Sequence, residues 1–484
     1  MKKLFYTILP VLLVGLFMAL SAASSLSESL TFDELVHSQE GINALTKHTF
    51  LIDTNNPPLI RELAMLPVVL GGGKLFPARF VIILLGALTL IAVYRVTKRY
   101  FGRTQALFAL FLLALEPTLL GHSHYVTLDI GVTLFFFIGY MAFVRLMERY
   151  SFSRLGVAAI AWGAAFASKM TAIPFLLISA FVAGAGIFKD SVRRFWTRPI
   201  RFVIFASLVA LMIWATYFLM PFGNYLAVIK NTLVRTGATP KIFFLGHFYP
   251  SARWYFMGNT FLLKIPIPLL LLFVLGLFAG RRPRDRKSIA VFAIPVFVVL
   301  GISSLVNIQP WVRYVLPAVP FFVIVASESM RLISGSVRKI LFLLFCLWYA
   351  YGTGLAFPHY ISYANELAGP AQSRYRIFTD SNLDWGQSLP DIARYIEKTQ
   401  PGYVSFSYFG RDNGDVYGLT SDMAYGSHRY EDICAFHHIN LPYTSPNIMV
   451  AISVSNWYYC KYNVDPRFSG RPVKAVVGGS ILIL

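Results

Sequence analysis

The sequence predicts a polytopic α-helical membrane protein with a small C-terminal α/β domain outside the membrane. Hydrophobic residues make up 56% of the 484 residues and charged residues only 14%, whereas soluble domains carry about a quarter charged residues. The apolar residues gather in blocks of about 17–25 residues, the length that crosses a bilayer as a helix. The region after residue 356 has far fewer such blocks. These observations favour a set of membrane spans followed by a separate domain.

Hydropathy predicts about eleven membrane spans. The first follows a basic N-terminus and precedes small residues, which is also typical of a cleaved signal peptide, but its apolar run is long enough to span the bilayer. The topology of the rest of the chain is the same in either case. The predicted spans lie near residues 4–22, 78–96, 105–117, 126–144, 155–168, 172–188, 202–220, 261–279, 289–306, 314–330 and 339–356.

The net charge of +20 comes mainly from short loops that alternate along the chain. One of them contains Lys189, Arg193, Arg194, Arg198 and Arg201. Short loops rich in Lys and Arg are cytoplasmic by the positive-inside rule. The charge therefore indicates topology, with anionic membrane lipids as the partner, and argues against a nucleic-acid partner.

With an odd number of spans and cytoplasmic basic loops, the C-terminal region lies on the outer face of the membrane, and the chain divides into two domains. Residues 1–356 form the transmembrane domain, and its loops 23–77 and 221–260 face outward. Residues 357–484 form an extracytoplasmic C-terminal domain, and the membrane is the inner (plasma) membrane of the cell. Within the C-terminal domain, alternating apolar patterns predict three stretches of strand and one amphipathic helix: YVSFSYFG, NIMVAISVS, VKAVVGGSILIL and SLPDIARYIEKT.

The three cysteines do not have the spacing of a metal site. Cys434 and Cys460 both fall in the outward C-terminal region. An oxidising compartment would allow a disulfide between them, and two free thiols remain an equal alternative.

Two neighbouring carboxylates follow the first span, in the sequence TFDELVH. Thr31 and Glu34 have the spacing of a capping box, in which Glu34 accepts from the amide at the helix start. That pattern explains Glu34 but not Asp33. Asp33 and His37 lie one turn apart and share a helix face. Asp33 is therefore the better candidate for chemistry.

Two further carboxylates flank the segment LEPTLLGHSHYVTLD. Glu116 ends one span and Asp129 begins the next. Carboxylates at membrane depth are costly and suggest function, although each could instead cap a helix. His122 and His124 form too small a set to indicate a metal site, and a polar turn is the simpler interpretation.

The outward segments also contain cations where the positive-inside rule does not expect them. Arg253 and Tyr255 belong to FFLGHFYPSARWYFMG, in which cations and aromatic rings alternate. Cations suit a phosphate, and aromatic faces suit a sugar ring. The alternatives are a lysine that extends to the interface and ordinary anchoring by aromatic rings. The candidate cations are Lys169, Arg253, Lys264 and Arg313.

A set of short motifs resembles the polytopic glycosyltransferases of the GT-C fold. Within them, the chain is similar to bacterial relatives of the protein O-mannosyltransferases and of the lipid A aminoarabinose transferase. The motifs occur in the family order over most of residues 30–395. They are FDELVHSQEG, NNPPLIREL, LEPTLLGHSHYVTLD, SKMT, YPSARWYFMGNTFLLKIPIP, VRYVLPAVPF and YISYANELAGP followed by TDSNLDWGQSL. One departure is Asn56 before Pro57 and Pro58, where the family has a histidine.

The resemblance implies transfer of a sugar from a polyprenyl-phosphate donor to an acceptor on the outer face. It implies no nucleotide, no cofactor and no catalytic metal. The implied general base is Asp33. The full predicted catalytic set is Asp33, Glu34, Glu116 and Asp129. The predicted contacts to the donor phosphate are Lys169, Arg253, Lys264 and Arg313, and those to the substrate are His37, His124 and Tyr255.

The expected reaction is an inverting transfer in which Asp33 takes a proton from the acceptor. The acceptor is a protein, a lipid or a glycan, and the sequence does not separate these. The alternative function is that of a lipid-linked sugar flippase or transporter without transferase activity. Transporters usually have internal repeats and charges in broken helices at the bilayer midplane. In this chain the unusual charges gather toward one face.

Overall fold

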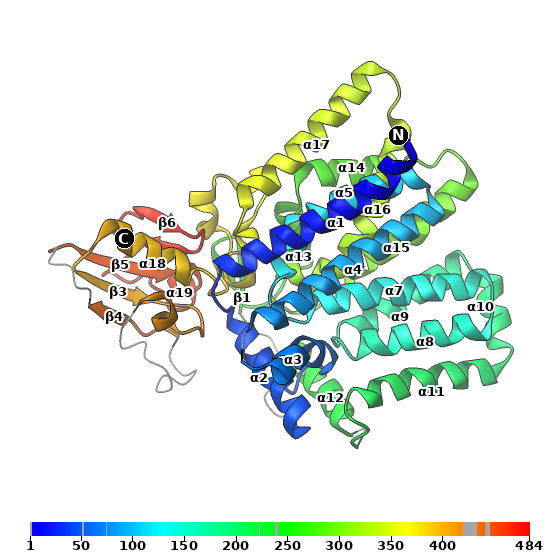
Figure 1. The fold of residues 1–484 in the computed structure, drawn as a ribbon, viewed down its shortest axis with the longest axis horizontal. Helices are drawn as coiled ribbons and strands as arrows, with labels where there is room; N and C mark the ends of the chain where they lie inside the picture. The colour runs from blue at the N-terminus through cyan, green and yellow to red at the C-terminus, as the bar shows by residue number, and fades with distance from the viewer. Residues whose placement is uncertain are drawn as a thin grey trace.

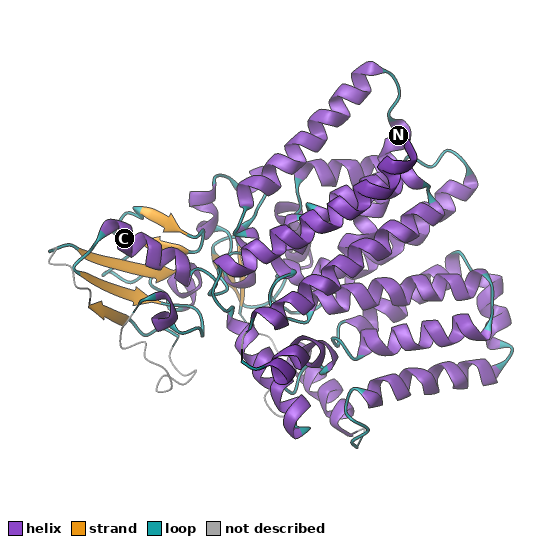
Figure 2. Ribbon diagram, in the orientation of Figure 1, coloured by secondary structure: helices purple, strands orange, loops and turns teal. Residues whose placement is uncertain are grey.

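The protein is described by a computed structural model that covers residues 2–50, 53–73, 75–221, 223–237, 241–419, 433–440 and 446–484. Long helices lie side by side in a bundle, and a sheet-containing domain lies at one end of it (Figures 1 and 2). The N-terminus and helix α10 (Lys189–Trp196) lie at the opposite end of the bundle (Figure 1). The expected combination of a helical membrane part with a small sheet domain is confirmed.

Six helices among the described residues are long and apolar enough to cross a membrane, or eight if each of two bent pairs is one span. The bent pairs are α9–α10, with an angle of 112°, and α13–α14, with an angle of 111°. In the second pair Pro266 follows α13, and proline cannot donate the backbone hydrogen bond that a continuous helix needs.

Each predicted span overlaps one of these helices, one of these pairs or a shorter apolar helix. How many of them cross the membrane stays a prediction. The single helices are α1 (Lys2–Ser27), α4 (Phe76–Tyr100), α7 (Asp129–Glu148), α15 (Pro283–Leu305), the run of η1 (Val312–Ala318), α16 (Val319–Ser327) and η2 (Glu328–Leu332), and α17 (Ser336–Ala356). The pairs join α9 (Ala172–Gly186) to α10, and α13 (Trp254–Lys264) to α14 (Ile267–Leu277). The shorter apolar helices are α5 (Arg103–Ala114), α8 (Phe152–Phe166) and α11 (Pro199–Ala215).

The segments predicted to face outward form short helices and a hairpin near the sheet-domain end of the bundle. They are α2 (Phe32–Lys47), α3 (Leu59–Gly71), α6 (Pro117–His122), α12 (Gly223–Gly237), β1 (Ile242–Phe244) and β2 (His247–Tyr249). Helix α2 packs closely on α3 at Gly41. A Cβ atom at Gly41 would lie 2.7 Å from the carbonyl oxygen of Arg61, so this packing requires glycine.

The described residues of the C-terminal region form a five-stranded sheet in the order β4-β3-β5-β7-β6. Strands β3 and β5 are parallel, and the other neighbours are antiparallel. The three predicted strand stretches and the predicted helix are present. The elements are α18 (Leu389–Thr399), α19 (Val454–Tyr459), β3 (Tyr403–Ser407), β4 (His437–Asn440), β5 (Ile448–Ser453), β6 (Ala475–Val477) and β7 (Ile481–Ile483). The 3-10 helices of this region are η3 (Tyr360–Ser362), η4 (Glu366–Ala368), η5 (Ala371–Arg376), η6 (Asp380–Asn382) and η7 (Gly414–Tyr417).

Covalent and apolar contacts hold the sheet domain together. Leu389, Ile392 and Ile396 of α18 are buried in a cluster with residues of the sheet, which explains the amphipathic pattern of this helix. Cys434 and Cys460 form a disulfide. Of the two alternatives for these cysteines, the structure contains the cross-link.

Buried polar contacts join the sheet domain to the membrane part. Glu28, just after α1, is buried and accepts hydrogen bonds from Tyr125, from His124 at 2.8 Å and from His359 at 3.1 Å. His359 also pairs with Asp391 of α18 at 3.3 Å. This network fixes the sheet domain against the end of the bundle where the outward segments gather.

Candidate active site

Asp33 and Arg313 form an ion pair at the end of the bundle that faces the sheet domain. Asp33 Oδ2 accepts a hydrogen bond of 2.7 Å from Arg313 Nη1. The Asp33 side chain is 32% exposed and that of Arg313 is 9% exposed. Arg313 Nε is buried and has no hydrogen-bond partner. An unpaired buried donor usually marks a place where water or a ligand binds.

The charge state of Asp33 follows from its neighbours. Burial by itself would raise the pKa of the Asp33 carboxyl. The charge of Arg313 and the hydrogen bond that it donates outweigh burial and hold this pKa below its ordinary value. Asp33 is therefore a carboxylate at neutral pH.

Three aromatic rings surround the Arg313 guanidinium. Its Cζ atom lies 4.6 Å from the ring centre of Trp311, 4.6 Å from that of Trp385 and 5.7 Å from that of Tyr314. A guanidinium is attracted to such aromatic faces, so the rings fix Arg313 in place. Trp385 comes from the C-terminal region, which therefore contributes directly to the site.

A second ion pair lies beside the first. Lys169, in the turn between α8 and α9, donates a 2.6 Å hydrogen bond to Asp129 at the start of α7. Lys169 Nζ also lies 5.0 Å from the centre of the Tyr314 ring, which the guanidinium of Arg313 contacts as well. The two pairs thus place two carboxylates and two cations around one tyrosine. An arrangement of this kind can bind a phosphate and accept a proton at neighbouring positions.

His37 shares the electrostatic environment of Asp33, as their spacing on one helix face predicts. Burial and the charge of Arg61 lower the pKa of His37 to about 4. The imidazole is therefore neutral at neutral pH. Its Nδ1 atom lies 3.9 Å from Asp53, which pairs with Arg61. His37 is placed to donate or accept a hydrogen bond without adding charge to the site.

Glu34 has a different environment from its neighbour Asp33. It is fully buried, and its two oxygens each accept a 2.8 Å hydrogen bond from Arg79. They also accept from the backbone amides of Thr31, in the predicted capping box, and Val126. These contacts fix the start of α2 against α4 and the segment before α7.

Three of the predicted site residues have structural partners. Glu116 caps α6 by accepting from the amide of Leu119 at 2.5 Å. Lys264 Nζ is buried and donates to the backbone carbonyls of Ile361, Tyr363 and Asn382. All three of its N–H groups are therefore used. His124, as described above, bonds to Glu28.

Arg253 and Tyr255 lie at the start of α13 and are exposed. Within the described ranges, no side-chain hydrogen bond or ion pair joins either of them to the Asp33–Arg313 pair. They lie near the hairpin β1–β2, since the Tyr255 ring centre is 6.2 Å from that of Phe244.

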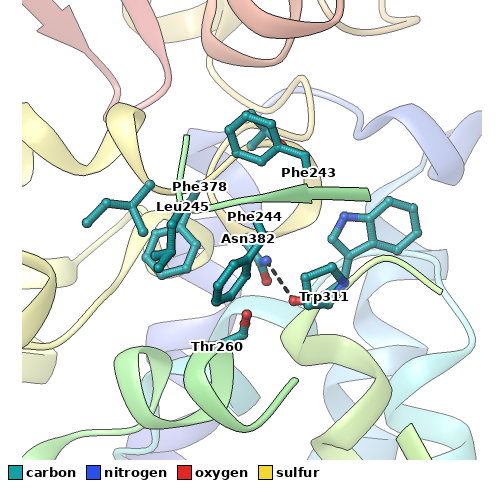
Figure 3. Close-up of a pocket in the computed structure, with 10 residues that line it drawn as sticks. Phe243, Phe244, Leu245, Thr260, Trp311, Phe378 and Asn382 are labelled. Atoms are coloured by element: carbon teal, nitrogen blue, oxygen red, sulfur yellow. Dashed lines mark hydrogen bonds between the residues drawn. The ribbon is translucent and has the colours of Figure 1, made fainter. Parts of the chain in front are cut away.

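An aromatic pocket opens next to the site (Figure 3). It lies between the hairpin β1–β2, helix α13 and the segment that follows η5. The dashed line marks the 3.1 Å hydrogen bond from Asn382 to the carbonyl of Pro310. Trp311 belongs both to this pocket and to the rings around Arg313. The labelled lining residues are Phe243, Phe244, Leu245, Thr260, Trp311, Phe378 and Asn382.

Several members of the site were not predicted from the sequence. His122 is buried, its Nδ1 has no partner, and it interacts electrostatically with Asp129, Arg313 and Lys169. Trp311 and Trp385 contact Arg313. The signal for Trp385 in the sequence was its place in the motif TDSNLDWGQSL. Within the part of the chain that the structure describes, no three His, Cys, Asp or Glu side chains gather closely enough to hold a metal ion.

Comparisons with known proteins agree with this architecture. Residues 55–219 match the family model described as dolichyl-phosphate-mannose-protein mannosyltransferase. No curated protein sequence matches the chain. The fold is similar to that of ArnT from Cupriavidus metallidurans in the apo state, with a TM-score of 0.56. The same protein bound to undecaprenyl phosphate gives a TM-score of 0.53. Both matches have 14% sequence identity and cover 98% of this chain and 97% of that chain.

A second similar structure is the archaeal oligosaccharyltransferase AglB from Archaeoglobus fulgidus, in complex with an inhibitory peptide and a dolichol-phosphate. It has a TM-score of 0.50 and 14% identity, and the match covers 83% of this chain and 58% of that chain. At this identity the solved structures establish the fold, and the family match over residues 55–219 adds the relationship in sequence. The chain therefore has the GT-C fold, and its residues 55–219 match the model of the protein mannosyltransferases, a family of membrane glycosyltransferases.

Proposed function

We propose that this chain transfers a sugar from a polyprenyl-phosphate donor to an acceptor on the outer face of the membrane, with inversion. The Asp33–Arg313 pair is the observation that carries the proposal. A carboxylate that can accept a proton and a cation that can bind a phosphate lie 2.7 Å apart. The similar structures support this donor class, since ArnT was solved with undecaprenyl phosphate and AglB with a dolichol-phosphate.

In this mechanism Asp33 acts as the general base. It takes the proton of an acceptor hydroxyl or amine as that group attacks the anomeric carbon. A bond forms between the acceptor atom and the sugar, and the bond between the sugar and the phosphate oxygen breaks. The bonding electrons leave with the carrier phosphate.

Arg313 and Lys169 stabilise the negative charge that develops on the leaving phosphate. The Nε–H group of Arg313 has no hydrogen-bond partner, and aromatic rings hold the guanidinium in place. Arg313 can therefore donate from Nε to the phosphate with little movement of its side chain. Asp129 keeps Lys169 in position through their 2.6 Å hydrogen bond. His37 is neutral and lies on the same helix face as Asp33, where it can orient the acceptor.

Donor binding and base activation are coupled in this arrangement. Arg313 bonds to Asp33 Oδ2, so this oxygen is already occupied by the guanidinium. A phosphate that takes the place of Asp33 as the partner of Arg313 frees the carboxylate for proton transfer. The enzyme then deprotonates an acceptor only when a donor is present.

The remaining predicted residues have other parts in the proposal. Lys264 is assigned a positioning role, because carbonyls occupy all its donors. Arg253 and Tyr255 stay candidates for contacts at the rim, next to the hairpin. The pocket that includes Trp311 is too small for a sugar ring, and the Asn382 amide already bonds to the backbone of Pro310 and Val312. It is therefore given no part in binding the sugar.

The chain is also proposed to lie in the plasma membrane with the sheet domain outside. Two observations support this topology. The cationic segment α10 and the N-terminus lie at the end of the bundle opposite the sheet domain (Figure 1), in keeping with the positive-inside rule. The disulfide Cys434–Cys460 is typical of an oxidising compartment.

The proposal is tested by mass spectrometry of glycolipids and glycoproteins from cells with and without the gene. The expected result is a glycan that depends on the gene. Purified protein in vesicles with polyprenyl-phosphate sugar then separates transfer from movement of the lipid across the bilayer. Sugar on an acceptor supports the transferase. Transbilayer movement without any transferred sugar would instead support the flippase function and overturn the proposal.

A further inference from the structure

Residues 379–388 of the C-terminal region lie against the Asp33–Arg313 pair, although they fall outside the residues matched by the family model. Trp385 contacts the Arg313 guanidinium, and its carbonyl accepts a 2.8 Å hydrogen bond from the amide of Phe32. Asn382 Oδ1 accepts a 2.9 Å hydrogen bond from the amide of Val312. The segment therefore bonds to Phe32, directly before Asp33, and to Val312, directly before Arg313.

Asp380 is the carboxylate that this segment brings to the pair. It is buried and interacts electrostatically with both Arg313 and Asp33. Its backbone has a positive φ of 50°, a conformation that few residues other than Gly, Asn and Asp adopt readily. The Asp380 amide donates to Ser455 Oγ at 2.9 Å, and Oδ1 accepts from the amide of Ser381 at 2.6 Å. These contacts fix the position of the carboxylate.

Asp380 carries its charge at neutral pH. Burial raises the pKa of its carboxyl to about 6, and the nearby Arg313 opposes a larger rise. Asp129 also interacts with Arg313, but it is bonded to Lys169. Among the described carboxylates that interact most strongly with Arg313, Asp380 neither acts as the proposed base nor forms an ion pair with another cation.

We propose that Asp380 is a second counter-ion of Arg313, which lowers the affinity of Arg313 for the carrier phosphate so that the spent carrier can leave. This inference rests on the proposed function. After transfer, Asp33 holds the proton of the acceptor and is neutral, and the carrier phosphate has gained the electrons of the broken bond. Arg313 would then bind this phosphate most tightly. A fixed negative charge at Asp380 repels the phosphate and attracts the guanidinium, which favours release.

The test is the binding of undecaprenyl phosphate to the full chain in phosphatidylcholine nanodiscs. Asp380→Asn removes the charge, tolerates the same φ, and keeps an oxygen for the amide of Ser381. We expect this variant to bind undecaprenyl phosphate about fivefold more tightly or more, with slower dissociation and slower turnover. The fluorescence of Trp311 and Trp385 offers a signal for binding. A merely structural role would weaken binding, so the sign of the change is informative.

Asp384→Asn is the matched control. Asp384 lies in the same segment, is also buried, and accepts a 2.7 Å hydrogen bond from the amide of Ser455. We expect its affinity for undecaprenyl phosphate to stay within about twofold of the unmodified chain, because this carboxylate has its own partner. If Asp380→Asn does not fold, Asp380→Gly removes the carboxylate at a residue type that suits the positive φ.

The outcomes separate the inference from the proposed function. Unchanged or weaker binding in a folded Asp380 variant overturns the counter-ion role. If Asp33→Asn is inactive while the Asp380 variants bind as the unmodified chain does, this inference alone fails. If Asp33→Asn retains full transfer, the proposed function fails. Tighter binding in the Asp380 variants, together with slower turnover, supports both.

Discussion

Asp33 and Arg313 are 280 positions apart in the sequence, and the structure joins them by a hydrogen bond of 2.7 Å. The proposed reaction needs the two groups for different tasks, since one accepts a proton and the other holds a phosphate. The proposed mechanism therefore requires the donor phosphate to replace Asp33 as the partner of Arg313.

Arg313→Lys is expected to weaken binding of undecaprenyl phosphate by about tenfold. Lysine keeps the charge but lacks the planar fork of donors and the stacking that Trp311 and Trp385 provide. The dissociation constant in nanodiscs measures the effect. Arg467→Lys serves as the control, because Arg467 lies on the surface, where it pairs with Asp465. Equal affinity in the Arg313 and Arg467 variants would show that the guanidinium does not hold the phosphate.

Glu34→Gln is expected to destabilise the chain by about 3 kcal/mol, because it leaves the buried Arg79 without a counter-ion. Thermal unfolding in detergent measures the loss. The control is Glu148→Gln, at a partly exposed pair in which Arg99 lies 3.5 Å away, and its cost should stay below about 1 kcal/mol. An equal, small loss in both variants would contradict the structural role of Glu34.

The contact between the sheet domain and the bundle should weaken at alkaline pH. Although burial opposes it, hydrogen bonds to Asp391 and Glu28 raise the pKa of His359 from 6.5 to about 10. The stabilisation is complete below about pH 6.5 and is lost as the pH rises toward 10. The unfolding temperature should therefore fall more between pH 7 and pH 9.5 in the unmodified chain than in His359→Gln. Parallel pH profiles would refute a charged His359.

Glu28 determines how the same contact between the sheet domain and the bundle responds to acid. Burial would raise its pKa, but hydrogen bonds and charge from His124 and His359 lower it to about 2. Because the pKa of Glu28 is lowered from its ordinary value of 4.5, the ionised carboxylate stabilises the fold fully above about pH 4.5. This contribution is lost as the pH falls toward 2. The contact should therefore resist mild acid.

The disulfide predicts the number of reactive thiols in protein purified from membranes. Alkylation after denaturation without a reductant should modify Cys346 alone, and reduction should expose Cys434 and Cys460 as well. Mass spectrometry of the alkylated chain gives the count directly. Three alkylated cysteines without reductant would contradict both the disulfide and the outward position of the sheet domain.

Local patterns in the sequence predicted most of the elements and part of the candidate site. The capping box at Thr31 and Glu34 is present, and Asp33 and His37 share an environment as their spacing predicts. These features depend on residues within one or two helical turns, where the period of the helix determines which side chains meet. The hydropathy pattern likewise located the long apolar helices.

The partners of the site residues could not be predicted, because they depend on contacts between distant segments. Nothing near Arg313 in the sequence indicates that Trp385 and Asp380 approach it. The partners of Lys264 could not be predicted either, because its three N–H groups bond to backbone carbonyls. Every residue has a carbonyl that can accept a hydrogen bond, and the sequence does not indicate which carbonyls lie close to Lys264. Strand β4 was missed because HHIN has no clear alternation of polar and apolar residues.

The most direct test of the account is Asp33→Asn, measured for sugar transfer and for binding of undecaprenyl phosphate in the same preparation. Asp415→Asn, at an exposed carboxylate of the sheet domain, is the matched control and should behave as the unmodified chain. The account predicts that Asp33→Asn loses transfer while it still folds and binds undecaprenyl phosphate at least as tightly, because Arg313 has lost a competing counter-ion. Transfer by Asp33→Asn at the rate of the unmodified chain would contradict the assignment of Asp33 as the base.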